Sequence, residues 1–85
     1  MRKTVRINGS NEICRSVEKS LDEYFRKLDG ESPHGIYDMV ITHVERALIT
    51  SVMERTNGNQ TQAAEMLGMN RNTLRTKLAK YGIRT

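Results

Sequence analysis

The segment from Ile36 to Arg55 constrains this chain most, because it runs for twenty residues without glycine or proline. Its apolar side chains recur at helical spacing and extend well beyond the ~100° stripe of an ordinary surface helix. Such a helix, roughly 30 Å long, needs apolar partners on more than one side. An 85-residue chain has little core to offer, so we expect a two-fold homodimer. The expected dimer interface comprises Val40, Val44, Ala47, Leu48 and Val52.

Three shorter helices are expected around this segment. The stretch from Glu12 to Leu28 carries apolar residues at helical spacing on one face, with Asn11 expected as its N-cap and Gly30 at its end. Two more helices follow the break at Asn57-Gly58. They are predicted at residues 60–67 and about 71–80, with Asn59 and Asn70 as N-caps and Gly68 and Gly82 after their last turns.

These elements predict an all-α, four-helix subunit, with two longer helices in front of a C-terminal helix-turn-helix. We expect one compact domain with three parts. Residues 1–10 form a flexible or short hairpin arm, suggested by the turn pair Asn8-Gly9. Residues 11–56 hold the dimerisation helices, and residues 57–85 form the helix-turn-helix.

Positive charge is confined to the C-terminal third of the chain. Residues 1–56 contain nine Lys or Arg and nine Asp or Glu, which sum to zero. Residues 57–85 contain five basic residues against Glu65 alone, so 5 − 1 = +4, which is the net charge of the whole chain. This asymmetry favours a polyanionic partner for the C-terminal end, although a solvated basic tail carries the same charge.

The pattern of residues 60–82 is typical of a helix-turn-helix, in which two short helices meet through a tight turn opened by a glycine. Ala63 and Ala64 are small enough for a close approach of the two helices. Leu74, Leu78 and Tyr81 fall at i, i+4 and i+7, which predicts that they face inward on the last helix.

The opposite face of the last helix suits a DNA groove. Arginine can bind a guanine edge, asparagine an adenine edge, and a threonine methyl can contact thymine. Backbone N–H groups around Asn59, Gln60 and Thr61 offer a phosphate anchor at the N-terminus of the preceding helix. The outward set, with Arg71 at the first helical position, comprises Asn72, Thr73, Arg75, Thr76, Ala79 and Lys80.

From about Ser16 to Gly82 the sequence resembles the Fis family of nucleoid-associated proteins. The resemblance is carried by TNGNQTQAAEMLGMNRNTLRTKLAKYGI, by SVEKSLDEYFRKLDG and by VERALITSVM. It implies an all-helical homodimer, in which the two longer helices of each subunit form an intertwined core, that bends double-stranded DNA and regulates transcription in the bacterial nucleoid. A protein that bends DNA with few base contacts is expected to select A/T-rich, degenerate sites by their deformability. The resemblance leaves contact with a recombinase or with RNA polymerase open, since the expected N-terminal arm is shorter than the family's mobile hairpin.

The resemblance also assigns DNA-contacting residues. Asn70 and Arg71 would be the base-reading pair, and the other positions mostly phosphate contacts. Thr76, Ala79 and Gln62 stand where the best-known member has basic residues, which implies weaker non-specific binding. The positions that match are Asn59, Gln60, Thr61, Asn70, Arg71, Thr73, Arg75, Lys77 and Lys80.

Two alternatives to a complete small DNA-binding protein stay open. The same helix-turn-helix closes many bacterial enhancer-binding activators, so the chain could be the C-terminal domain of a longer regulator. The initial methionine and two upstream helices favour a complete protein. The second alternative is an adaptor that uses the long apolar helix to bind a protein and has no nucleic-acid partner.

Enzymatic and metal-dependent functions are disfavoured, and no cofactor is expected. His34 and His43 are nine residues apart, outside any usual metal-ligand spacing, and no further ligand set lies near them. Cys14 is the only cysteine, which excludes an internal disulfide. No segment approaches the ~18–20 apolar residues of a membrane span, and no signal peptide is evident. A cytoplasmic location is therefore expected, and the resemblance to the Fis family implies that it is the nucleoid.

Overall fold

The structure, a computed structural model, describes residues 11–84. These residues form four helices and no strand: α1 (Glu12–Arg26), α2 (Ile36–Arg55), α3 (Gln60–Leu67) and α4 (Arg71–Tyr81). The predicted all-α class is thereby confirmed, while the expected N-terminal arm lies outside the described residues. The chain divides into two compact units, residues 1–36 and residues 37–85, so α2 belongs with α3 and α4.

In the first unit, α1 begins where the sequence predicted and ends earlier. The Asn11 side chain accepts a hydrogen bond of 2.8 Å from the Cys14 N–H, which confirms its role as N-cap. The helix ends at Arg26: the next two N–H groups turn to i−3 carbonyls, Lys27 to Tyr24 at 3.2 Å and Leu28 to Phe25 at 3.4 Å, and Asp29 adopts a left-handed φ of +54°. Gly30 lies beyond this cap, in the turn that follows, and does not end the helix. None of the residues of α1 is buried.

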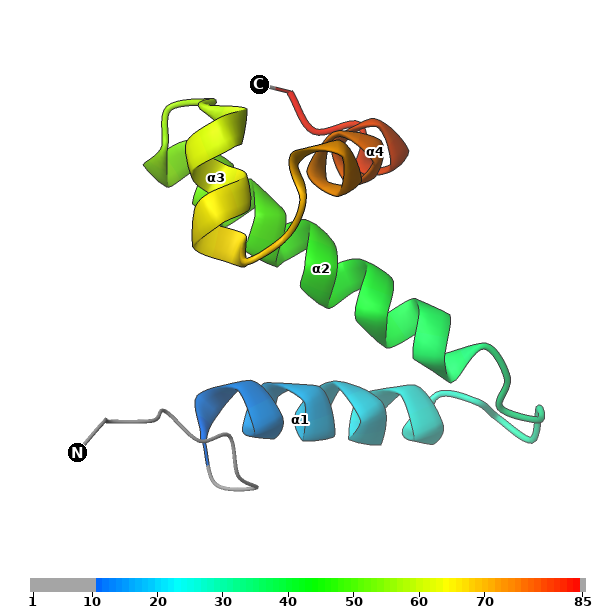
Figure 1. Ribbon diagram of the computed structural model, residues 1–85. Helices are drawn as coiled ribbons and strands as arrows, with labels where there is room; N and C mark the ends of the chain where they lie inside the picture. The colour runs from blue at the N-terminus through cyan, green and yellow to red at the C-terminus, as the bar shows by residue number, and fades with distance from the viewer. Residues whose placement is uncertain (1–10, 85) are drawn as a thin grey trace. The chain divides into compact units, whose positions relative to one another are not determined.

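In the second unit, α3 and α4 pack over the second half of α2 (Figure 1). Ile49 of α2 and Leu74 of α4 are fully buried in this core, and Ala63 of α3 has no exposed surface either. The small side chain of Ala63 therefore lets α3 approach its neighbours closely, as predicted. The other buried hydrophobic residues of the core are Met53, Ala64, Leu78 and Tyr81.

The ends of α2, α3 and α4 share one geometry. After α3 and α4 the chain turns through Gly68 and Gly82, both in the left-handed region, at φ +75° and +64°. After α2 the same place is taken by Asn57, at φ +54°. Its N–H bonds to the Glu54 carbonyl at 3.2 Å, and the next N–H bonds to the Met53 carbonyl at 2.9 Å. This pair of hydrogen bonds is a Schellman motif, which satisfies the last carbonyls of a helix.

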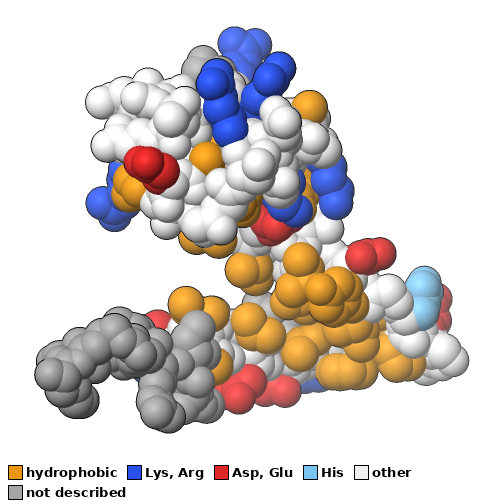
Figure 2. All heavy atoms as spheres, viewed as in Figure 1, with side chains coloured by type: hydrophobic (Ala, Val, Ile, Leu, Met, Phe, Trp, Pro, Cys, Tyr) orange, Lys and Arg blue, Asp and Glu red, His pale blue; other side chains and the backbone are white. Residues whose placement is uncertain are grey.

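α2 presents two apolar faces, one covered and one bare. Ile49 and Met53, in its second half, lie in the core of the unit. Hydrophobic side chains also gather on the surface of its first half (Figure 2). They follow one another at the 4-3-4 spacing of a coiled-coil seam, and all are at least 39% exposed: Tyr37, Ile41, Val44 and Leu48.

Asn57 provides a test of the cap that sets the start of the helix-turn-helix. A non-glycine residue in the left-handed conformation costs roughly 1–2 kcal/mol, and asparagine tolerates it better than alanine. We expect Asn57→Ala to lower the free energy of unfolding by about 1 kcal/mol and Asn57→Gly to leave it equal or raise it slightly. Urea unfolding followed by circular dichroism measures this, with Glu54→Ala as an exposed helical control. Equal stability of the Ala and Gly variants would contradict the assignment.

Candidate nucleic-acid interface

The N-termini of α3 and α4 are capped by asparagine and carry no acidic residue in their first turns. Asn59 accepts a hydrogen bond of 3.0 Å from the Gln62 N–H, and Asn70 accepts one of 2.7 Å from the Asn72 N–H. Both predicted caps are confirmed. In a full capping box, the side chain of Gln62 would also accept a hydrogen bond from the Asn59 N–H. That N–H donates instead to the carbonyl of Thr56, at 3.1 Å. Remaining N–H groups at these ends suit a phosphate oxygen.

The outer surface of α4 is solvent-exposed. Leu74, Leu78 and Tyr81 are buried as predicted, which turns the polar side chains of the helix away from the core. Thr76 also donates a hydrogen bond of 3.0 Å from its hydroxyl to the Asn72 carbonyl, so its methyl group is left for contacts. Eight of the ten predicted DNA-contacting residues are exposed: Asn59, Thr61, Asn70, Arg71, Thr73, Arg75, Thr76 and Lys80.

Figure 2 shows Lys and Arg side chains gathered over the helix-turn-helix part of the second unit. On α4, Arg71 and Arg75 lie one turn apart on one flank of the helix, and Lys80 lies toward the other flank. Between these rows the surface is neutral, formed by Asn72, Thr76 and Ala79. The arrangement places guanidinium groups beside side chains that can contact base edges.

Lys77 and Gln60, the other two predicted contacts, are only half-exposed. The Lys77 ammonium nitrogen lies 2.9 Å from Oε2 of Glu45, a residue of α2. The predicted DNA contact of Lys77 stays a prediction, but the structure gives this residue an internal partner.

Tyr81, at the end of α4, binds the same carboxylate of Glu45. Its ring is buried, with 6% exposed, and its hydroxyl donates to Oε1 of Glu45 at 2.5 Å. Arg46 and Lys80 place their charges 5.7 and 5.3 Å from the ring centroid, within the range of cation–π attraction. Lys77 and Tyr81 are therefore joined to α2 through one acidic residue.

These contacts shift two pKa values in opposite directions. The hydrogen bond from Tyr81 and the one from Lys77 lower the pKa of Glu45, because both stabilise its charged form. The hydrogen bond to Glu45 raises the pKa of Tyr81, since it favours the protonated phenol.

Sequence reasoning missed the part played by Glu45. Glu45 lies 36 residues from Tyr81 in the chain, and no local pattern links the two residues. The i, i+4 spacing of Lys77 and Tyr81 was the available signal, since it places both side chains on one side of α4.

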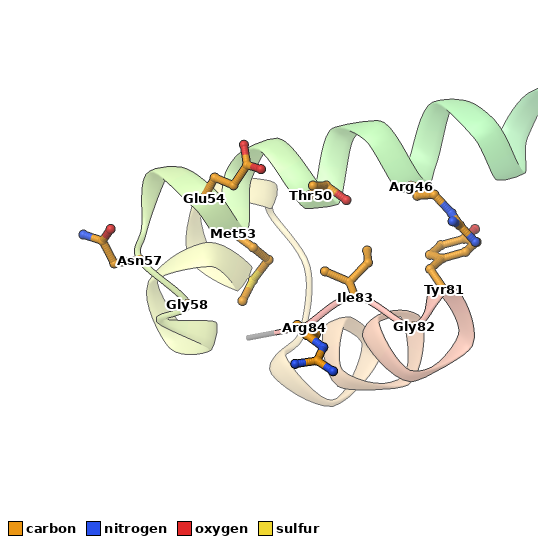
Figure 3. Close-up of a pocket in the computed structure, with 10 residues that line it drawn as sticks. All are labelled: Arg46, Thr50, Met53, Glu54, Asn57, Gly58, Tyr81, Gly82, Ile83 and Arg84. Carbon is orange, nitrogen blue, oxygen red and sulfur yellow. The ribbon is translucent and has the colours of Figure 1, made fainter.

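A hollow of about 530 Å³ opens beside Tyr81, between the second half of α2 and the segment that follows α4 (Figure 3). Arg46 lies next to the Tyr81 ring at one end of it, and Asn57 points away from it at the other. Its lining mixes Met53 and Ile83 with charged side chains and faces solvent, so it lacks the enclosed apolar walls of a small-molecule pocket.

The five residues predicted for a dimer interface fall in different environments. Val44 and Leu48 belong to the bare stripe of α2, 42% and 50% exposed, and Ala47 is exposed beside them. Val40 is half-buried, while Val52 packs against the core of its own unit.

Within residues 11–84, no three His, Cys, Asp or Glu side chains are grouped so that they could hold a metal ion. None of the helices formed by these residues is both long and apolar enough to cross a membrane.

The pH dependence of stability tests the Glu45–Tyr81 contact. Because the pKa of Glu45 is lowered in the folded state, its contribution is present above its usual value of 4.5 and is lost as pH falls through the lowered pKa. Because the pKa of Tyr81 is raised, its contribution is present below its usual value of 10.0 and is lost as pH rises through the raised pKa. The stability difference between wild type and Tyr81→Phe should be constant from about pH 5 to 9 and shrink at both ends. Urea unfolding at pH 3, 7 and 11 measures it; a difference as large at pH 3 as at pH 7 would exclude the ionised carboxylate as the partner.

Comparison with known protein sequences identifies the family of this chain. The profile described as "Bacterial regulatory protein, Fis family" matches residues 41–81, which run from α2 to the end of α4. A "Putative Fis-like DNA-binding protein" of Ralstonia nicotianae is 52% identical over 86% of this chain and 95% of its own length. A protein of the same description from Neisseria meningitidis serogroup A is 47% identical over 85% of this chain and 91% of its own. The "DNA-binding protein Fis" of Proteus mirabilis is 48% identical over 91% of this chain and 84% of its own. This chain belongs to the Fis family of bacterial regulatory proteins.

Proposed function

We propose that this protein binds double-stranded DNA through α3 and α4. The outer surface of α4 supports this proposal most strongly. There Arg71 and Arg75 lie along one flank of an exposed surface that has no acidic residue and begins at the Asn70 cap. Base edges are recognised by such side chains in the major groove, while phosphates bind to cations and helix N-termini. The relatives that are 47–52% identical to the chain are named DNA-binding proteins, which supports the proposal.

We propose that Asn70 and Arg71 contact bases and that Asn59, Gln60 and Thr61 meet a phosphate at the start of α3. The first turn of α3 has no acidic residue to compete with that phosphate. Thr73, Arg75, Thr76 and Lys80 complete the surface on α4. An enzymatic role has no support in this arrangement, and the relatives' names describe binding alone.

The working unit in this proposal is a homodimer. The bare stripe of α2 supports it, since four large apolar side chains on one seam are unfavourable in water and would be covered if the stripes of two copies packed about a two-fold axis. α1 supports it as well, because its apolar residues Ile13 and Phe25 are 58% and 48% exposed. The dimer would carry one α4 at each side of the two-fold axis.

The resemblance to the Fis family further suggests that two such helices meet one DNA duplex only when the duplex bends. We therefore propose a DNA-bending regulator of transcription that acts in the nucleoid and prefers A/T-rich, degenerate sites. A protein that bends DNA with few base contacts selects its sites by deformability and minor-groove width.

Substitution at Arg71 tests DNA binding. Loss of a bidentate base contact removes roughly 1–3 kcal/mol, so we expect Arg71→Ala to weaken binding of a specific duplex by about 5- to 150-fold. Arg71→Ala combined with Arg75→Ala should abolish the gel shift. Arg26→Ala, the same change on exposed α1, is the control. If the double variant still bound DNA as the wild type does, α4 would not be the DNA-binding helix. If the wild type bound no DNA and the double variant still bound a protein partner, the adaptor alternative would be favoured.

Substitution in the apolar stripe tests the dimer. A glutamate at Leu48 would place a charge in the proposed interface, where burying it is strongly unfavourable. We expect Leu48→Glu to raise the dimer dissociation constant by about a hundredfold or more, measured by analytical ultracentrifugation. His43→Glu adds the same carboxylate to an exposed position on another side of α2 and should leave the dimer intact. Equal effects of the two variants would place the interface elsewhere.

A further inference from the structure

The ion pair between Lys77 and Glu45 differs from an ordinary surface pair. Its two side chains are 28% and 21% exposed, whereas the Arg15–Glu12 pair on α1 is 53% and 91% exposed. Both oxygens of the Glu45 carboxylate are used, one by the ammonium group of Lys77 and one by the hydroxyl of Tyr81. Partly buried pairs are screened by salt much less than exposed pairs. In the free protein, the positive charge of Lys77 is therefore already compensated by the carboxylate of Glu45.

The position of Lys77 on α4 explains why it has this partner. At about 100° per residue, Lys77 lies about 60° from Leu74 on the same side as Tyr81. Arg71 and Arg75 lie on the other side of Leu74, where no carboxylate of the described residues pairs with them. Tyr81 and Lys77, one turn apart, therefore both face Glu45 of α2.

We infer that Glu45 is a positioning residue that withholds Lys77 from DNA phosphates, so that each helix-turn-helix offers one cation fewer than its sequence contains. The inference rests on the proposed DNA binding and specifies which cations perform it. To contact a phosphate, Lys77 would have to leave Glu45 with a single partner. Lys77 thus fixes α4 on α2, while Arg71, Arg75 and Lys80 supply the charge that meets DNA.

The consequence is a restraint on sequence-independent binding. Each protein cation that neutralises a phosphate of duplex DNA steepens the salt dependence of log K against log [salt] by about 0.9. Withholding Lys77 in both subunits of a dimer removes about 1.8 from this slope. Non-specific binding depends almost entirely on this electrostatic contribution, so it is reduced more than the recognition of bases.

Salt titrations of binding to a random-sequence duplex test the inference with three variants. Glu45→Gln keeps an oxygen that accepts from Tyr81 but releases Lys77, and should steepen the slope by about 1.8 and strengthen binding at low salt. Lys77→Met should leave the slope at its wild-type value. Glu45→Gln combined with Lys77→Met should return the slope to that value. The matched control is Glu65→Gln, which makes the same charge change on exposed α3 and should not steepen the slope.

Opposite results would overturn the inference. If Lys77→Met made the slope shallower by about 1.8 while Glu45→Gln left it unchanged, Lys77 would be a phosphate contact. Thermal unfolding of each variant shows whether the variant is folded. If Glu45→Gln does not fold, the slope measured with Lys77→Met decides the question, because Lys77→Met leaves the Glu45–Tyr81 contact in place. A wild-type slope near zero would instead refute the proposed DNA binding itself, so the two failures are distinguishable.

Discussion

The second half of α2 is buried under α3 and α4, and this packing sets the arrangement of the second unit. Ile49 and Met53 reach the core only because Ala63 and Ala64 leave room for α3, and because Leu74 closes the space from α4. Packing of this kind, and not helix propensity, stabilises helices as short as α3, which has eight residues. It orients the outer side of α4 toward solvent and leaves the first half of α2 bare.

Hydrogen bonds and an ion pair fix the helix ends and join α2 to α4. The Schellman turns after α2, α3 and α4 each pair two of the last carbonyls of the helix, and asparagine side chains cap the starts of α3 and α4. Glu45 then joins α2 to α4 through Tyr81 and Lys77. One acidic residue therefore joins the candidate recognition helix to α2 and pairs with one of its cations, Lys77.

Most of the fold could be predicted from the sequence, because its signals are local. Helical periodicity and glycine or asparagine at the helix ends located all four helices, and the i, i+4, i+7 series of Leu74, Leu78 and Tyr81 gave the buried side of α4. The early end of α1 could not be predicted, since Gly30 offered a stronger stop signal than Lys27. The Glu45 contacts could not be predicted either, because they depend on how α2 and α4 pack across 36 residues of sequence. Val52 shows the same limit: its apolar character was evident, but not which of two apolar faces it joins.

If exposed cations of a dimeric helix-turn-helix meet DNA phosphates, binding must weaken steeply as salt rises, and a salt titration of the wild-type protein measures this. Equal-length duplexes with flexible A/T-rich centres and with stiff centres should be compared. Three or four exposed cations per subunit, from Arg71, Arg75, Lys80 and Arg84, predict slopes of about −5 to −7 for the dimer on both duplexes. The flexible duplex should bind more tightly at every salt concentration, because bending it costs less. A slope near zero, or equal affinity for the two duplexes, would contradict the account.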